Sequence, residues 1–233
     1  NHVILLKELD ATKYAKDILK HLANLDIEKG SEVLAAKLAT DVERYDFAIQ
    51  ISKQASYQKR YFNKYNYPII STPKKINNKI MPNTEVILAI IRQESEFDKR
   101  ANSWAGARGM MQLMKYTAKI VAKQAKLPYS ISNLTRDPEY NIKLGSYYFN
   151  SLIEDYNGVY PFAIAAYNAG PNRVKTWRRV NGDPSKGDLS YVNWVELIRF
   201  EETRNYVQRV IENINVYKYM LNKEPVTIDN FFD

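Results

Sequence analysis

One glutamate, Glu94, stands where a chain could build a general acid that works near neutral pH. It follows the apolar run 87–91 and precedes a glycine-rich turn at residues 103–109. Because the apolar positions bury most sides of the predicted helix, a carboxyl near its end loses water and its pKa is expected to rise. Such a carboxyl can donate a proton in catalysis. Most helical glutamates are ordinary surface residues, so this interpretation depends on the surroundings of Glu94.

Two later segments carry side chains that could complete a binding site. Gln112 lies among Met and Leu residues, where a half-buried amide needs a hydrogen-bond partner, either a ligand or a neighbouring backbone group. Tyr167 and Asn168 come at the end of a short helix before Gly170. They could hold a sugar through a hydroxyl, a ring face and an amide, or they could be a packed ring and a helix end ahead of a capping glycine. Both alternatives stay open from the residues alone.

Several other chemistries have little support in this sequence. The 233 residues include no cysteine, which excludes disulfides, thiol nucleophiles and thiolate metal sites. The two histidines, His2 and His21, lie far in sequence from Glu94. Serine–histidine catalysis and histidine zinc sites are therefore poorly supported, and we expect no metal and no cofactor.

The net charge indicates an anionic partner but does not identify it. Lys and Arg number 34 against 26 Asp and Glu, which gives a formal charge of +8. A basic surface suits nucleic acid, acidic lipid or a cell-wall glycan that carries peptide carboxylates. The lysines are scattered along the chain, so a charge dispersed for solubility is an equally good interpretation.

Helical periodicity runs through nearly the whole chain and predicts an all-α fold without a strand pair. We expect a small helical domain over residues 1–75 and a catalytic domain over residues 76–233, joined by a proline-containing connector within 63–83. The helices predicted in the first domain cover 3–24, 31–38 and 42–55, and those in the second cover 83–95, 110–123, 138–157, 162–167, 171–177 and 203–221, with a polar loop at 183–193.

The chain starts at Asn1 with no initiator Met and no signal-like stretch. We therefore expect a mature form or a piece of a longer protein. No stretch approaches the roughly 20 apolar residues that a membrane-spanning helix needs.

Four motifs follow one another along the chain: Gln93-Glu-Ser95, Ser103-x-x-Gly-Ala-x-Gly-x-Met-Gln-Leu-Met114, Ala166-Tyr-Asn-Ala-Gly170 and Glu202-Thr-Arg-x-Tyr206. In this order they resemble the soluble lytic transglycosylases, bacterial enzymes that cleave peptidoglycan and have a goose-lysozyme-like catalytic domain. The resemblance runs from about residue 82 to residue 221. The helices before it resemble, more loosely, the linker domain of the large doughnut-shaped members, whose long helical superhelix is not in this chain.

The resemblance implies that Glu94 is the single catalytic acid and base. Tyr167 would orient the reacting sugar, and Glu202 would contact the sugar or the stem peptide. The substrate-binding residues that the resemblance implies are Ser103, Gln112, Met114, Tyr167, Asn168 and Glu202. Two positions depart from the family pattern: Met110 replaces a usual Leu, and Arg199 replaces a common Pro, which allows the loop before Glu202 to take another path.

The resemblance also implies a reaction: non-hydrolytic cleavage of the MurNAc–GlcNAc β-1,4 bond, which leaves 1,6-anhydro-MurNAc ends. The implied partners are peptidoglycan glycan strands and stem peptides, with room for other cell-wall enzymes, and the implied location is the periplasm. A hydrolytic muramidase on the same fold is the nearest alternative. An inactive glycan-binding module is a second alternative. A nucleic-acid-binding protein ranks last, because only the net charge supports it. We expect no nucleic-acid partner.

Overall fold

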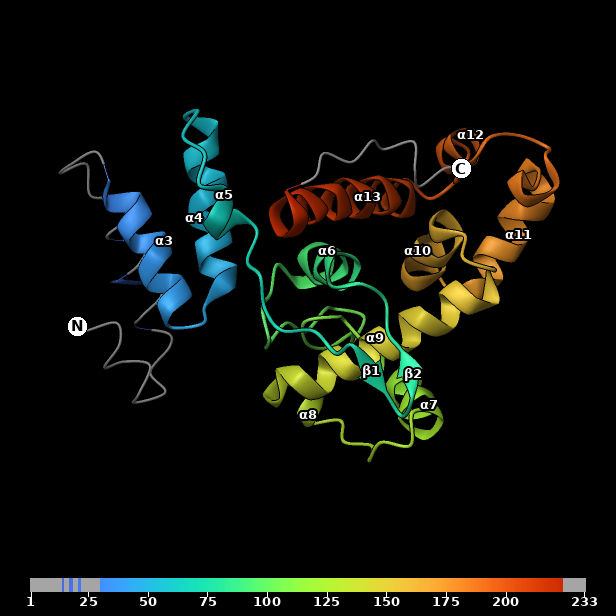
Figure 1. The fold of residues 1–233 in the computed structure, drawn as a ribbon, viewed down its shortest axis with the longest axis horizontal. Coiled ribbons are helices and arrows are strands. Elements are labelled where there is room, and N and C mark those ends of the chain that lie inside the picture. Colours follow the sequence, from blue (N-terminus) through green and yellow to red (C-terminus); the bar gives the residue numbers. More distant parts are fainter. Residues whose placement is uncertain (1–13, 15–16, 19–20, 22–29, 224–233) are drawn as a thin grey trace. The chain divides into compact units, whose positions relative to one another are not determined.

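The structure is a computed structural model that describes residues 14, 17, 18, 21 and 30–223 (Figure 1). The helix predicted over 3–24 therefore lies almost wholly outside the described residues. The chain divides into two compact units. The first comprises residues 1–70 with 95–98, and the second comprises residues 71–94 with 99–233. The predicted domain boundary after residue 75 stays a prediction.

From residue 30 onward, the described part of the first unit contains α3 (Ser31–Asp41), α4 (Tyr45–Tyr57) and α5 (Asn63–Asn66). Three fully buried alanines of α3 pack with Phe47 and Ile51 of α4. Small side chains let the two helix backbones approach closely, so a short pair of helices can still form a core. The helices predicted at 31–38 and 42–55 are confirmed, with slightly different ends.

A two-stranded antiparallel hairpin opens the second unit, in the segment predicted to be an unstructured connector. Strand β1 (Lys75–Ile76) pairs with β2 (Lys79–Ile80). The two turn residues between them, Asn77 and Asn78, both have positive φ, which is the geometry of a tight hairpin turn. The prediction that the chain holds no strand pair was wrong here, because two-residue strands are too short to show an alternating pattern.

The rest of the second unit is helical, and the all-α class is confirmed. Its helices are α6 (Thr84–Ser95), α7 (Lys115–Gln124), α8 (Asn133–Arg136), α9 (Pro138–Asp155), α10 (Tyr160–Ala169), α11 (Pro171–Asn181), the 3₁₀ turn η1 (Pro184–Lys186), α12 (Tyr191–Glu196) and α13 (Glu201–Asn222). Helix α10 is buried from Pro161 to Ala166 and contacts α9, α11 and α13. A helix that is apolar on all sides needs such neighbours. It thus joins α9, α11 and α13, while α7 and α8 pack on α9 (Figure 1).

Two boundaries differ from the sequence prediction. The helix predicted from Met110 begins only at Lys115, because the chain first makes a tight turn in which Arg108 and Leu113 exchange both backbone hydrogen bonds, each 3.0 Å long. The loop predicted over 183–193 contains η1 and the start of α12. The start of α9 is as predicted: the Asp137 carboxylate accepts a hydrogen bond from the backbone N–H of Tyr140 at 3.0 Å.

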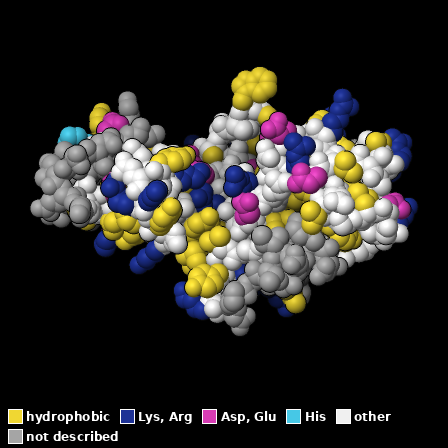
Figure 2. All heavy atoms as spheres, turned by 90° about the horizontal axis from the view of Figure 1, so that it is seen from above, with side chains coloured by type: hydrophobic (Ala, Val, Ile, Leu, Met, Phe, Trp, Pro, Cys, Tyr) yellow, Lys and Arg dark blue, Asp and Glu magenta, His cyan; other side chains and the backbone are white. Residues whose placement is uncertain are grey.

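The basic surface charge is dispersed on the face of the molecule drawn in Figure 2. There the Lys and Arg side chains of the described residues lie among acidic and apolar ones. This arrangement matches the interpretation of a charge spread for solubility better than that of a continuous nucleic-acid-binding stripe. Among the helices of the described residues, none combines the length and the apolar character needed to cross a membrane.

Candidate active site

Helix α6 brings Glu94 from a dry interior to the edge of the protein. The five residues 87–91 are fully buried, so the helix is fixed on nearly all sides. Glu94 is the residue before the last one of α6, and its side chain is half-buried. The helix ends there because Glu96 and Phe97 both have positive φ. Glu94 is therefore held rigidly while its carboxyl keeps access to the surface.

The carboxyl of Glu94 accepts a hydrogen bond from the hydroxyl of Tyr206 on α13, which donates to Oε1 at 2.6 Å. Burial raises the pKa of Glu94 from its ordinary value of 4.5 to about 7, although the Tyr206 hydrogen bond acts in the opposite direction. Burial together with the neighbouring Glu94 charge also holds the pKa of Tyr206 well above its usual value. Tyr206 thus stays a proton donor at neutral pH, and Glu94 is poised between its two protonation states.

A second carboxylate, Glu202, lies close enough to act on Glu94. It sits in the first turn of α13 and is exposed. Its negative charge makes the smallest of the three contributions to the pKa of Glu94 and raises it. Glu202 and Tyr206 are four residues apart and so lie on one face of α13, the face that meets Glu94.

Tyr167 lies on another side of Glu94 and is held by its own hydroxyl. This hydroxyl donates a hydrogen bond of 2.8 Å to the carbonyl oxygen of Met111. Its ring packs against those of Tyr148 and Phe149, with centroids 5.3 Å and 5.9 Å away. Burial raises the pKa of Tyr167 well above its usual value, and the Glu94 charge adds to this. Tyr167 is therefore a fixed, neutral ring beside the carboxyl.

The loop that supplies the Met111 carbonyl is locked by one buried amide, Asn141 of α9. Asn141 is fully buried. Its Oδ1 accepts from the N–H of Met111 at 2.8 Å, and its Nδ2 donates to the carbonyl oxygens of Arg108 at 2.9 Å and Leu134 at 3.0 Å. All three bonds are made in a dry environment, where an unpaired group would be costly. One side chain thus fixes both ends of the turn at 108–111.

Gly109 lies where this turn approaches α8 and α9 most closely. Its φ is +74°, and a Cβ built on it would meet the carbonyl oxygen of Leu134 at 1.9 Å and Nδ2 of Asn141 at 2.4 Å. A side chain of any size would therefore displace Asn141. The glycine-rich turn has a packing role here, which the sequence alone did not distinguish from a role in substrate access.

The structure places the predicted site residues in two groups. Glu94, Tyr167 and Glu202 are brought together around one carboxyl. Three others use their side chains internally: Ser103 Oγ accepts from the N–H of Ala107 at 2.9 Å, Gln112 Nε2 donates to the Gly109 carbonyl at 2.8 Å, and Asn168 Oδ1 accepts from the Thr203 hydroxyl at 2.7 Å.

Met114 is the remaining predicted site residue. It precedes α7 with its side chain 43% exposed. No described contact links it to the Glu94 carboxyl, so its place in a substrate-binding surface stays a prediction.

Two residues of the site were not among the predicted ones. Tyr206 was named only as the last residue of the fourth motif, although its spacing of four from Glu202 could have placed it beside Glu94. Asn141 has a subtler signal: it stands four residues before Gly145, which places an amide and a glycine on one helix face. Gly145 allows the Met111 side chain to pack closely, since a Cβ there would lie 2.4 Å from Sδ.

Over the described part of the chain, no group of three or more His, Asp or Glu side chains is placed to hold a metal ion.

The chain belongs to the family described as the transglycosylase SLT domain, which matches residues 71–189, just over half of its length. The matched region contains Glu94, the glycine-rich turn and Tyr167, whereas Glu202 and Tyr206 lie beyond it.

Named relatives agree with this family. The chain is 39% identical over 139 residues to the soluble lytic murein transglycosylase of Escherichia coli, a match that covers 59% of this chain and 21% of the relative. The crystal structure of the 70 kDa soluble lytic transglycosylase from Escherichia coli superposes with a TM-score of 0.79 at 29% identity, covering 94% of this chain and 35% of that one.

The structure of an inactive Glu-to-Gln mutant of the lytic transglycosylase Slt from Pseudomonas aeruginosa superposes with a TM-score of 0.76 at 31% identity. That match covers 99% of this chain and 36% of the other. The fold of this protein is thus the lysozyme-like fold of the soluble lytic transglycosylases. The chain spans only about a fifth to a third of the length of these relatives.

Proposed function

We propose that this protein is a peptidoglycan lytic transglycosylase, with Glu94 as its general acid and base. The observation that carries the proposal is the Glu94 carboxyl, whose pKa of about 7 and single tyrosine donor suit a group that must give and then take one proton. A relative whose inactive form carries a Glu-to-Gln change supports a glutamate in this role.

In the first step, protonated Glu94 donates its proton to the oxygen of the MurNAc–GlcNAc β-1,4 bond. The bond between C1 and that oxygen breaks, and positive charge develops at C1. The N-acetyl oxygen of the same sugar stabilises this charge. The exposed carboxylate of Glu202, on the same side of α13 as Tyr206, adds electrostatic stabilisation.

In the second step, Glu94 is a carboxylate and removes the proton from the 6-hydroxyl of the same sugar. The oxygen attacks C1 and closes a 1,6-anhydro ring, so Glu94 ends protonated and no water is consumed. An intramolecular nucleophile has a high effective concentration and needs no second base. Tyr206 eases the first step, because its hydroxyl stabilises the carboxylate that forms when Glu94 gives up its proton, and it holds that carboxylate in place for the second step.

The remaining predicted residues form the proposed binding surface. Tyr167 would orient the reacting sugar with its fixed ring. Ser103, Gln112 and Asn168 would act chiefly by shaping the surface, since their side chains already hold the loop and the helix ends. Met114 would offer an exposed apolar contact.

A hydrolytic muramidase on the same fold remains the competing proposal, because Glu202 could position water near C1. The mass of the products separates the two reactions. We expect digestion of purified peptidoglycan to give ends lighter than reducing ends by one water, detected by mass spectrometry. Reducing ends alone would overturn the transglycosylase proposal.

Replacing Tyr206 with Phe is expected to move the alkaline limb of the pH–rate profile to higher pH. In the unaltered protein the Tyr206 hydrogen bond stabilises the carboxylate form of Glu94. Without this bond the pKa of Glu94 rises further, so Glu94 stays protonated to a higher pH. We also expect kcat/KM at the optimum to fall about 10- to 150-fold, since a hydrogen bond to a charged group is worth roughly 1.5–3 kcal/mol.

The matched control is Tyr219→Phe, on the same helix but 55% exposed. It should leave both the limb and the rate unchanged. If the alkaline limb of the pH–rate profile does not move in Tyr206→Phe, a group other than Glu94 is responsible for that limb.

The wider context of the chain follows from the same proposal. The substrate would be glycan strands with their stem peptides, and a wall substrate implies a periplasmic location. Residues 1–75 would form a linker-type helical domain before the catalytic domain of residues 76–233.

A further inference from the structure

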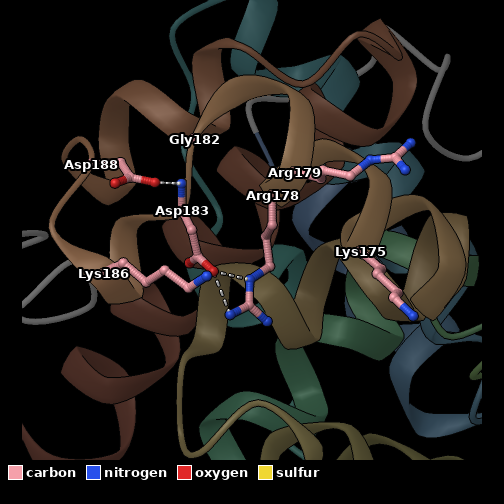
Figure 3. A pocket seen from close by; sticks show the side chains of 7 residues that line it. All are labelled: Lys175, Arg178, Arg179, Gly182, Asp183, Lys186 and Asp188. Carbon is pink, nitrogen blue, oxygen red and sulfur yellow. Dashed lines mark hydrogen bonds and ion pairs between the residues drawn. The ribbon is translucent and has the colours of Figure 1, made fainter.

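A cavity of about 370 Å³ lies at the C-terminal end of α11, in the same unit as Glu94 (Figure 3). Most of its charged lining is basic, supplied by Lys175, Arg178, Arg179 and Lys186, against the two carboxylates Asp183 and Asp188. The proposed reaction gives this cavity no role. Its composition indicates a binding site for an anion, if the basic groups are not already neutralised.

Both carboxylates of the cavity are engaged within the protein. Asp183 accepts hydrogen bonds from Arg178 Nε at 3.0 Å and Nη2 at 2.7 Å, and from the Ser185 hydroxyl at 2.7 Å. Burial would raise the pKa of Asp183, but the bonds from Arg178 and Ser185 outweigh it and hold this pKa below its usual value. Asp188 Oδ2 accepts from the backbone N–H of Asp183 at 2.7 Å.

The remaining basic groups are available to a ligand. Lys175, Arg179 and Lys186 are exposed, and within the described residues none of them forms an ion pair. In Figure 3, Lys186 extends toward the Asp183–Arg178 pair from one side, while Lys175 and Arg179 lie on the other side, on α11. Lys186 beside the Asp183–Arg178 pair, with Lys175 and Arg179 farther away on the lining, gives a positively charged surface that suits a carboxylate.

We propose that this cavity binds a carboxylate of the peptide carried by the glycan, an inference that rests on the proposed function. Helix α11 begins at Pro171, four residues after Tyr167, and Lys175 and Arg179 follow one and two turns later. At 1.5 Å per residue, Arg179 lies about 12 Å along the helix from its start. A peptide of four extended residues spans about 13 Å, so one whose sugar lies at the start of α11 is long enough to reach Arg179.

Calorimetric titration of the full chain with a soluble wall-type tetrapeptide tests this site. The double variant Lys175→Ala with Arg179→Ala is expected to weaken binding about tenfold, since each exposed charge contributes up to ~1 kcal/mol. Amidation of the peptide carboxylates should weaken binding to the unaltered protein by a similar factor. This second measurement needs no variant and so does not depend on the folding of one.

The control double variant is Lys119→Ala with Lys123→Ala, two exposed residues of α7 that change the net charge equally. It should bind the tetrapeptide as the unaltered protein does. Equal weakening by both double variants would show a general charge effect and overturn the site. Inorganic phosphate bound as tightly as the tetrapeptide would overturn the assignment to a peptide carboxylate, and so would the absence of any tetrapeptide binding.

The titration measures binding without bond cleavage, so its result is independent of the reaction. Loss of tetrapeptide binding alongside anhydro products would overturn this site alone. Reducing-end products alongside intact tetrapeptide binding would overturn the proposed reaction alone.

Discussion

Replacing Glu94 with Gln is expected to lower the rate of peptidoglycan cleavage at least about a thousandfold. Gln has nearly the same shape and can still accept the Tyr206 hydrogen bond, so the site keeps its geometry. It cannot donate an acidic proton to the glycosidic oxygen or take one from the 6-hydroxyl, so both steps lose their catalyst. Release of soluble fragments from purified wall measures the loss. Unchanged release would show that Glu94 is not the acid.

The same substitution should make the protein more stable at neutral pH. The pKa of Glu94 rises from 4.5 to about 7 on folding. Between these pH values the folded protein holds a proton that the unfolded chain has released. The free energy of unfolding therefore falls as the pH rises through this range. Above pH 7 the total loss is up to ~3 kcal/mol. Gln does not ionise and escapes this loss. We therefore expect a gain in the free energy of unfolding at pH 8 that disappears at pH 4.

A matched control separates this effect from the general loss of a negative charge. Glu212→Gln removes an exposed carboxylate on α13 that pairs with Arg209 on the surface. It should change neither activity nor the pH dependence of stability. A gain of equal size at pH 4 and pH 8 in Glu94→Gln would contradict the ionisation argument.

The helices of the second unit could be predicted well because each carries its own local signal. Asp137 with Pro138 marks the start of α9, and Pro171 marks the start of α11. The segment 110–114 could not be assigned in this way. Its apolar residues suit a helix, but the structure is decided by a distant partner, Asn141, whose bonds to the turn have no counterpart in local sequence.

The candidate acid could be located from sequence, but its environment could not. The apolar run before Glu94 correctly indicated burial and a raised pKa. Tyr206 stands 112 residues away, and only the packing of α13 brings its hydroxyl to the carboxyl. Glu202 likewise acts on Glu94 through space. Such contacts depend on how helices meet, which periodicity within one helix does not encode.

Replacing Gly109 with Ala is expected to destabilise the protein by about 4 kcal/mol or more. The positive φ costs a non-glycine residue about 1–2 kcal/mol. The larger cost comes from contact, because the new Cβ would lie 1.9 Å from a backbone oxygen and 2.4 Å from the Asn141 amide. Moving Asn141 leaves the buried N–H of Met111 unpaired, at about 1–3 kcal/mol, and the Arg108 carbonyl keeps only its bond from the Leu113 N–H.

Gly106→Ala in the same loop isolates the effect of this contact. Gly106 also has a positive φ, +89°, but nothing lies within 4 Å of a Cβ built there. It should therefore cost only the backbone strain, and the difference between the two variants in urea unfolding measures the clash with Leu134 of α8 and Asn141 of α9. Because the Met111 carbonyl holds the Tyr167 hydroxyl, Gly109→Ala should also impair catalysis in the molecules that remain folded. Equal destabilisation by the two alanines would mean that the turn tolerates a side chain at Gly109 and that Asn141 does not lock it.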